Sequence, residues 1–157
     1  MKREIPIYGF GVTYEHANRL IESYKRLTGN TLIPVDQEKD AVKALFYAPF
    51  ILLSHGTQEN PVLNYGNEAA LTLWEMDWDT FTHTPSSQTA EPMLQSTREE
   101  FLKQVRTHGF AKGYSGVRIS KTGRRFMIID VVLWNLIDES GEYHGQAAMF
   151  ERFEYLH

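Results

Sequence analysis

The chain has 157 residues, a net charge of −4 and no cysteine. The length fits one domain, and the lack of cysteine excludes disulfides, thiolate metal ligands and cysteine nucleophiles. The lack of cysteine also favours a cytoplasmic protein. Because the charge is acidic and no apolar run approaches the roughly 20 residues of a membrane span, we expect no nucleic-acid or membrane partner.

The first half of the chain predicts helices that alternate with short strands. The expected elements are helices over 13–28 and 37–47, strands over 50–54 and 62–65, and short helices after Asn67 and over 77–83. In the first helix, apolar residues recur every three or four positions, and Gly29 ends it. Asp36 and Asn67 are suitable N-caps for the later helices.

The second half predicts one longer helix and three strands. Residues 84–92 have loop composition, and residues 94–108 form a helix. Its inward stripe consists of Leu94, Arg98, Phe101, Val105 and His108. After Gly109, three strands are joined by tight turns at 121–123 and 138–141, each with a glycine that supplies positive φ.

The central strand of this meander, residues 124–138, is apolar on both faces. Strict alternation places one set of side chains together, namely Phe126, Ile128, Asp130, Val132, Trp134 and Leu136. One face should pack on the short helices. The other face needs a cover, for which the N-terminal helix and a second subunit are both candidates.

This order of elements resembles the PAS arrangement, and the chain is similar to the MEKHLA family of PAS-related domains. The matching segments include APFILLSHG at 48–56, NPVLNYGNEAALTLWEMDW at 60–78, YSGVRIS at 114–120 and GQAAMF at 145–150. Asn60 and Gln95 depart from the family pattern, which commonly has Asp and Arg there.

The resemblance implies an α+β, PAS-like fold. It has a five-stranded antiparallel sheet, with short helices and a longer helix on one face. Residues 1–47 would be an N-terminal helical extension packed on the sheet or on a second subunit, and 48–157 the PAS-like MEKHLA domain. The family implies sensing or regulation and transfers no catalytic residues.

Signatures of enzymes and cofactors are mostly absent from the sequence. We find no GxSxG, HExxH, P-loop or Rossmann glycine motif. Flavin–cysteinyl photochemistry is excluded by the lack of cysteine. His108 is the best single haem-ligand candidate, but an interaction with the helix dipole is favoured there, so we expect neither haem nor a metal. His55 should order the first turn by hydrogen bonding.

Two charged residues interrupt apolar patterns. Arg98 could clamp a carboxylate or phosphate of a ligand, or it could form an internal ion pair with Asp130 or Glu91. Asp130 stands in an apolar strand, and a buried charge without a partner is costly. The sequence leaves both alternatives open and places both residues in the candidate site.

Aromatic and small residues of the meander suggest a ligand cavity between sheet and helices. Besides Arg98 and Asp130, the candidate ligand-binding residues are Trp74, Tyr114, Arg118, Trp134, Asn135 and Gln146. Aromatic walls with a few polar groups suit a small planar organic molecule. The alternative is that the aromatic side chains fill the core and leave no cavity.

Three functions are compatible with these sequence features. The first is a non-catalytic sensory module that binds a small organic ligand of unknown identity and signals through protein association. The second is an interaction or dimerisation module without a ligand, favoured by the apolar central strand; its partner would be a second copy or a regulatory protein. The third is a small enzyme using His55, Asp130 or Arg98, which no motif supports.

Overall fold

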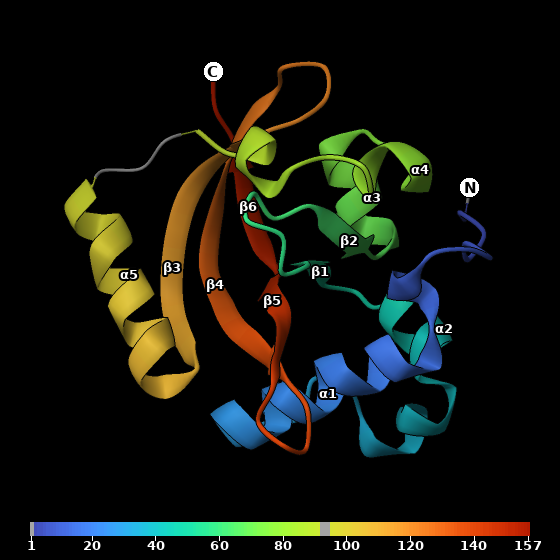
Figure 1. The fold of residues 1–157 in the computed structure, drawn as a ribbon. Helices are drawn as coiled ribbons and strands as arrows, with labels where there is room; N and C mark the ends of the chain where they lie inside the picture. The colour runs from blue at the N-terminus through green and yellow to red at the C-terminus, as the bar shows by residue number, and fades with distance from the viewer. Residues whose placement is uncertain (1, 92–94) are drawn as a thin grey trace.

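A computed structural model describes residues 2–91 and 95–157. Over this part of the chain it contains one antiparallel sheet with helices on both faces (Figure 1). The strands are β1 (Ile51–His55), β2 (Leu63–Gly66), β3 (Phe110–Ile119), β4 (Arg125–Ile137), β5 (Tyr143–Phe150) and β6 (Arg152–Tyr155). Their order is β2-β1-β5-β4-β3, and β6 pairs with the first part of β4. The α+β class is confirmed; the last predicted strand is interrupted at Glu151, which gives six strands.

The helices also follow the predicted order. They are α1 (Tyr14–Thr28), α2 (Ala41–Phe46), α3 (Glu68–Trp74), α4 (Trp78–Phe81) and α5 (Gln95–His108), with 3₁₀ turns η1 (Phe10–Val12), η2 (Val35–Asp40) and η3 (Ser86–Thr89). The predicted helix over 37–47 is shorter than expected, because its first turn belongs to the 3₁₀ segment. None of the helices in the described ranges is long and apolar enough to cross a membrane.

Helix α1 is amphipathic and closed by caps at both ends. The Thr13 side chain accepts a hydrogen bond from the backbone N–H of His16, and Gly29 ends the helix in the left-handed conformation with φ of 78°. Its buried side chains recur at helical spacing and comprise His16, Ala17, Leu20, Ile21, Ser23 and Tyr24.

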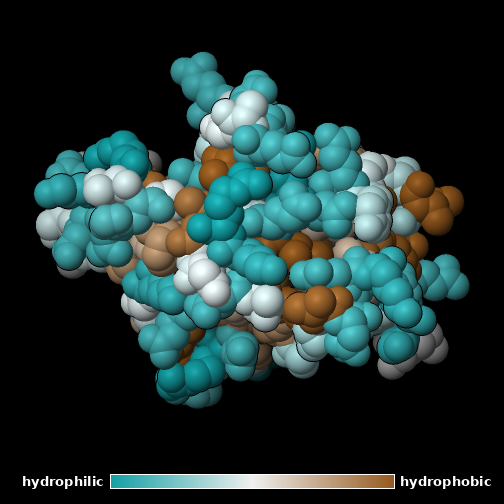
Figure 2. Space-filling model, turned by 90° about the horizontal axis from the view of Figure 1, so that it is seen from below, coloured by the Kyte–Doolittle hydropathy of each residue, from teal (hydrophilic) through white to brown (hydrophobic). Residues whose placement is uncertain are grey.

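Seen from below, the surface of the molecule is mainly hydrophilic, with separate hydrophobic patches (Figure 2).

The buried side of α1 packs on the second half of β4. Ser23 Oγ donates to the carbonyl oxygen of Ile137 at 2.9 Å and accepts from its N–H at 3.0 Å. The ring of Tyr24 meets Trp134 edge-on, with centroids 4.9 Å apart. Of the two covers considered for this face, α1 therefore supplies one, and Figure 1 shows it crossing the end of the β4–β5 hairpin.

Helix α3 is fixed to the other face of the sheet by Asn67. Its Oδ1 accepts from the N–H groups of Ala70 and Leu52, both at 3.1 Å. Its Nδ2 donates to the carbonyl oxygens of Phe50 at 2.8 Å and Leu45 at 3.2 Å. One fully buried side chain thus caps α3, as predicted, and also ties it to β1 and α2.

A bulge interrupts β4 at Asp130, where φ is 55°. Gly116 pairs with Ile128, and Tyr114 pairs with Val131, so β4 carries one more residue than β3 between these two pairs. An extra residue reverses which face the following side chains occupy.

The bulge overturns the predicted faces of the central strand. Ile128 lies on the same face as Val131 and Leu133, toward α5. Trp134 and Leu136 lie on the opposite face, under α1. Strict alternation failed because it assumes that a strand has no bulge.

Candidate ligand-binding cavity

A cavity of about 210 Å³ lies between the sheet and α5, on the face opposite α1. Apolar side chains form most of its wall, among them Leu53, Trp74, Phe101, Val131, Leu133 and Phe150. Space remains partly because Ala148 of β5, which pairs with Leu53 and Leu133, has only a methyl side chain. The helices do not fill this side of the sheet completely.

Trp74 holds the α3 side of the cavity rigid. Its ring meets Phe126, Phe81 and Phe150 edge-on, with centroid distances of 5.3, 6.2 and 6.3 Å. Such pairs favour edge-to-face contact and fix the orientation of the rings. This wall is therefore a packed aromatic cluster with one surface toward the open space.

On the sheet, polar side chains reach the cavity from β3 and from β1 and β5. On β3, Arg118 Nη2 donates to the hydroxyl oxygen of Tyr114 at 3.0 Å, and Arg118 Nη1 donates to the carbonyl oxygen of Val117 at 3.0 Å. On paired positions of β1 and β5 stand His55 and Gln146. The cavity thus combines an apolar interior with a guanidinium, a phenol, an imidazole and an amide.

Four of the eight predicted ligand-binding residues line this cavity: Trp74, Tyr114, Arg118 and Gln146. Tyr114 and Arg118 were predicted from alternation along β3, which is unbroken between them. Their binding of a ligand remains a prediction, whereas their convergence on one space is a feature of the structure.

Trp134 and Asn135 stand elsewhere. Trp134 is fully buried under α1, because the bulge at Asp130 turns it away from the cavity. Asn135 does not line the cavity; its Oδ1 accepts a hydrogen bond of 3.5 Å from Gln146 Nε2. Asn135 therefore orients a cavity residue, and Trp134 belongs to the opposite layer.

Asp130 is a surface residue, which contradicts the expectation of a buried charge. Its Oδ2 accepts a hydrogen bond of 3.1 Å from Arg152 Nη1, and the two side chains are 68% and 66% exposed. Exposed pairs of this kind contribute little to stability. The predicted internal partner of Arg98 is thus paired with another arginine.

Glu91, the other proposed partner of Arg98, is bound by both Arg125 Nε and Arg125 Nη2, the latter at 3.0 Å. This contact lowers the pKa of the Glu91 carboxyl. Arg98 lies on α5, but its side chain is outside the described part of the structure. Leu94, from the same predicted stripe, is also outside the described residues.

The two histidines singled out from the sequence have separate environments. His55 Nδ1 is 2.9 Å from the carbonyl oxygen of Gly56, which confirms its predicted role in the turn. His55 also lines the cavity. His108 is exposed in the last turn of α5, so it does not lie on the inward stripe where a haem ligand was considered.

Sequence reasoning missed the contribution of the segment at 84–92. Its composition predicts a loop, whereas η3 places Ser86 and Thr89 at the cavity. The backbone bridge between Ala90 and Arg118 holds this segment against β3. The serine- and threonine-rich composition indicates a turn but gives no sign of which strand it meets.

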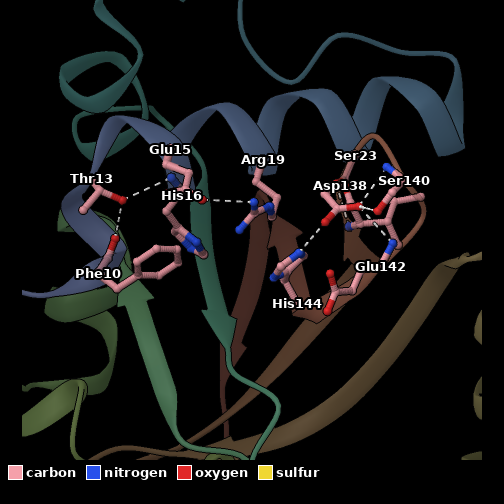
Figure 3. A network of polar contacts seen from close by, with 11 residues as sticks. Phe10, Thr13, Glu15, His16, Arg19, Ser23, Asp138, Ser140, Glu142 and His144 are labelled. Carbon is pink, nitrogen blue, oxygen red and sulfur yellow. Dashed lines mark hydrogen bonds and ion pairs between the residues drawn. The ribbon is translucent and has the colours of Figure 1, made fainter.

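A second polar cluster lies on the α1 face of the sheet (Figure 3). His16 is 1% exposed, and its Nε2 is 2.9 Å from Ser54 Oγ, which in turn donates to Asn64 Oδ1 at 2.6 Å. Burial, followed by the positive charge of Arg19, lowers the pKa of His16 to about 4. The serine's proton is directed to Asn64, so this pair lacks the geometry of an activated nucleophile.

Asp138, Glu142 and His144 lie within reach of one another at the β4–β5 turn (Figure 3). Asp138 accepts hydrogen bonds from the N–H groups of Ser140 and Glu142, both at 2.9 Å, and its Oδ2 lies 2.9 Å from His144 Nε2. These contacts, that from His144 above all, hold the pKa of Asp138 well below its usual range. The carboxylate is occupied by the turn, which is a structural role.

The comparisons with known proteins agree with this architecture. Residues 14–155 match the family model described as the MEKHLA domain. The crystal structure of a PAS domain from Colwellia psychrerythraea superposes with a TM-score of 0.60 at 16% identity, covering 75% of this chain and 95% of that chain. The chain matches no curated protein.

Two further solved structures show the same fold. The light-state dimer of the fungal blue-light photoreceptor Vivid gives a TM-score of 0.60 at 18% identity, covering 87% of this chain and 93% of that one. A PAS domain from a two-component sensor histidine kinase gives 0.56 at 15% identity, covering 75% and 95%. At such low identity the likeness extends to the fold alone.

Proposed function

We propose, from the premise that this chain belongs to the MEKHLA domain family, that it is a non-catalytic sensory module with a small organic ligand in its cavity. The family places it among PAS-like sensory domains. The ligand would lie between the sheet and α5, and the signal would pass by association with another protein. The cavity of about 210 Å³, apolar with a few polar groups, is the observation that carries this proposal.

A route for the signal starts at the wall of the cavity. The N–H of Lys121 donates to the carbonyl oxygen of Trp74 at 3.0 Å, which links the end of α3 to the β3–β4 turn. Glu75 reinforces this link by accepting from Ser120 Oγ at 2.5 Å and from Thr122 Oγ1. A ligand that moves Trp74 would therefore move an exposed turn. It can do so only through different affinities for two conformations.

The test combines detection of a ligand with closure of the cavity. Native mass spectrometry of the purified chain should show a co-purifying small molecule. Ala148→Leu should remove that molecule, because the added side chain extends into the open space beside Leu53 and Leu133. Thr107→Leu, at an exposed position of α5, is the matched control and should retain it. Equal loading of both variants would contradict the proposal.

An interaction module without a ligand is the second candidate, supported by the outer face of β3 and β4 beyond α1. Val117 pairs there with Met127, and Ile119 and Ile129 extend the same half-buried apolar face. A second copy or another protein would cover it. Light scattering should then give a dimer mass that Met127→Glu reduces to the monomer, with no co-purified molecule.

A further inference from the structure

We propose that the cavity selects a monocarboxylate with a small apolar body, and that Arg118 binds the carboxylate. This inference rests on the proposed ligand-binding function and adds the chemical class of the ligand. It transfers to Arg118 the anion-binding role that the sequence suggested for Arg98. Two observations carry it: the sign of the charge in the cavity and the way in which Arg118 is held.

Within the described part of the chain, the cavity wall has a positive charge and no matching negative one. Among the described residues that line it there is no Asp or Glu, while Arg118 places a guanidinium there. The described contacts of that guanidinium are with neutral groups only: the hydroxyl and the ring of Tyr114, the ring centroid lying 5.4 Å from Arg118 Cζ, and the carbonyl of Val117. Neutral acceptors compensate a half-buried guanidinium incompletely, which favours an anionic ligand.

Arg118 is oriented before any ligand arrives. It stands four residues after Tyr114 on the same face of β3, with Gly116 between them. A Cβ on Gly116 would lie 2.7 Å from the Tyr114 hydroxyl and 3.1 Å from Arg118 Nη1. Glycine at this position therefore makes room for the Tyr114–Arg118 contact. The contact limits the freedom of the guanidinium, which reduces the entropy lost on binding.

The apolar lining and the volume of the cavity determine which apolar group of a ligand can fit. Phe101, Val131 and Leu133 offer apolar contact. An apolar cavity of about 150 Å³ is known to hold benzene, so about 210 Å³ suits one ring with a short chain. A single guanidinium matches one carboxylate in a two-donor contact, whereas a doubly charged phosphate would be only half neutralised. These features together indicate an arylalkanoate or a short-chain fatty acid.

The experiment compares two probes that share one body. Isothermal titration with 3-phenylpropanoate and with the uncharged 3-phenylpropan-1-ol measures the preference for the carboxylate directly. The full chain should bind the carboxylate at least about tenfold more tightly. Arg118→Met keeps the apolar stem, and it should weaken carboxylate binding by about tenfold while alcohol binding changes less than about twofold. Arg106→Met, exposed on α5, should leave both affinities unchanged.

A second variant keeps the test decisive if Arg118→Met does not fold. Arg118→Lys retains the charge but loses the two-donor fork, so it should show an intermediate preference. Circular dichroism establishes whether each variant is folded. If Arg118→Met is unfolded, a carboxylate preference in Arg118→Lys that is smaller than in wild type supports the proposal, and an unchanged preference contradicts it.

The failures of the two proposals are distinguishable. If wild type binds the two probes equally, or if the preference survives in Arg118→Met, the cavity is a ligand site and the carboxylate assignment is wrong. If neither probe binds and the native protein carries no molecule that Ala148→Leu removes, the proposed function is wrong as well.

Discussion

The apolar strands are covered in different ways on the two faces of the sheet. On the α1 face, Trp134 and Leu136 are fully buried, and a buried polar cluster pairs His16 with Ser54. On the α5 face, Leu133 of the same strand borders an open space. One layer is therefore solid and the other hollow, and the hollow one offers room for a ligand.

The bulge at Asp130 decides which side chains belong to which layer. Without it, Trp134 would face the cavity side and Leu133 would face α1. With it, the large indole fills the solid layer, next to Tyr24. A single irregular residue thus turns the bulky ring of Trp134 away from the cavity and places the smaller Leu133 there instead.

The largest expected effect comes from truncating leucines on opposite faces of β4. Leu136→Ala should reduce the free energy of unfolding by about 3 kcal/mol, because the removed methyl groups leave a void in close packing. Leu133→Ala should cost about 1 kcal/mol, since its neighbourhood is already open. Urea unfolding of both variants measures the difference. Equal losses would contradict the contrast between a solid and a hollow layer.

An effect of similar size should appear in the pH dependence of the solid layer. Folding lowers the pKa of His16 to about 4, below that of a histidine in the unfolded chain, about 6.5. Between these values the unfolded state binds the extra proton, so stability rises with pH and is lost on acidification. The slope should reach about 1.4 kcal/mol per pH unit, or roughly 3 kcal/mol in total.

Urea unfolding of wild type and His16→Gln from pH 4 to pH 7 measures this dependence. The variant removes the titrating group at a position beside Ser54, so its stability should change less across the window. Asp138 also titrates in acid, with a lowered pKa, so its contribution is lost as pH falls. Because both proteins contain Asp138, their difference isolates His16. Parallel curves would contradict the assignment of the acid-sensitive step.

Much of this arrangement could be predicted from local patterns. Caps such as Asn67 and turns such as 138–141 depend on short-range chemistry, so the sequence was sufficient to place them. Tyr114 and Arg118 were placed together because they lie on one face of β3, whose own alternation is unbroken between them. Periodicity is reliable wherever the repeat is unbroken.

The remaining features, a bulge and a long-range contact, leave no trace in local periodicity. An acidic residue in an apolar strand suggested a buried ion pair, but Asp130 is at a bulge that turns it outward. The contact of His16 with Ser54 joins residues 38 positions apart, and no local pattern predicts it. Long-range packing, in both cases, determined the outcome.

A crystal structure under xenon pressure would test the hollow layer most directly, since xenon enters empty apolar cavities. We expect a xenon site beside Val131, Leu133 and Phe101, and none between α1 and Leu136. If side chains closed the space on the α5 face and no xenon entered it, the sheet would have two solid layers and no room for a ligand there.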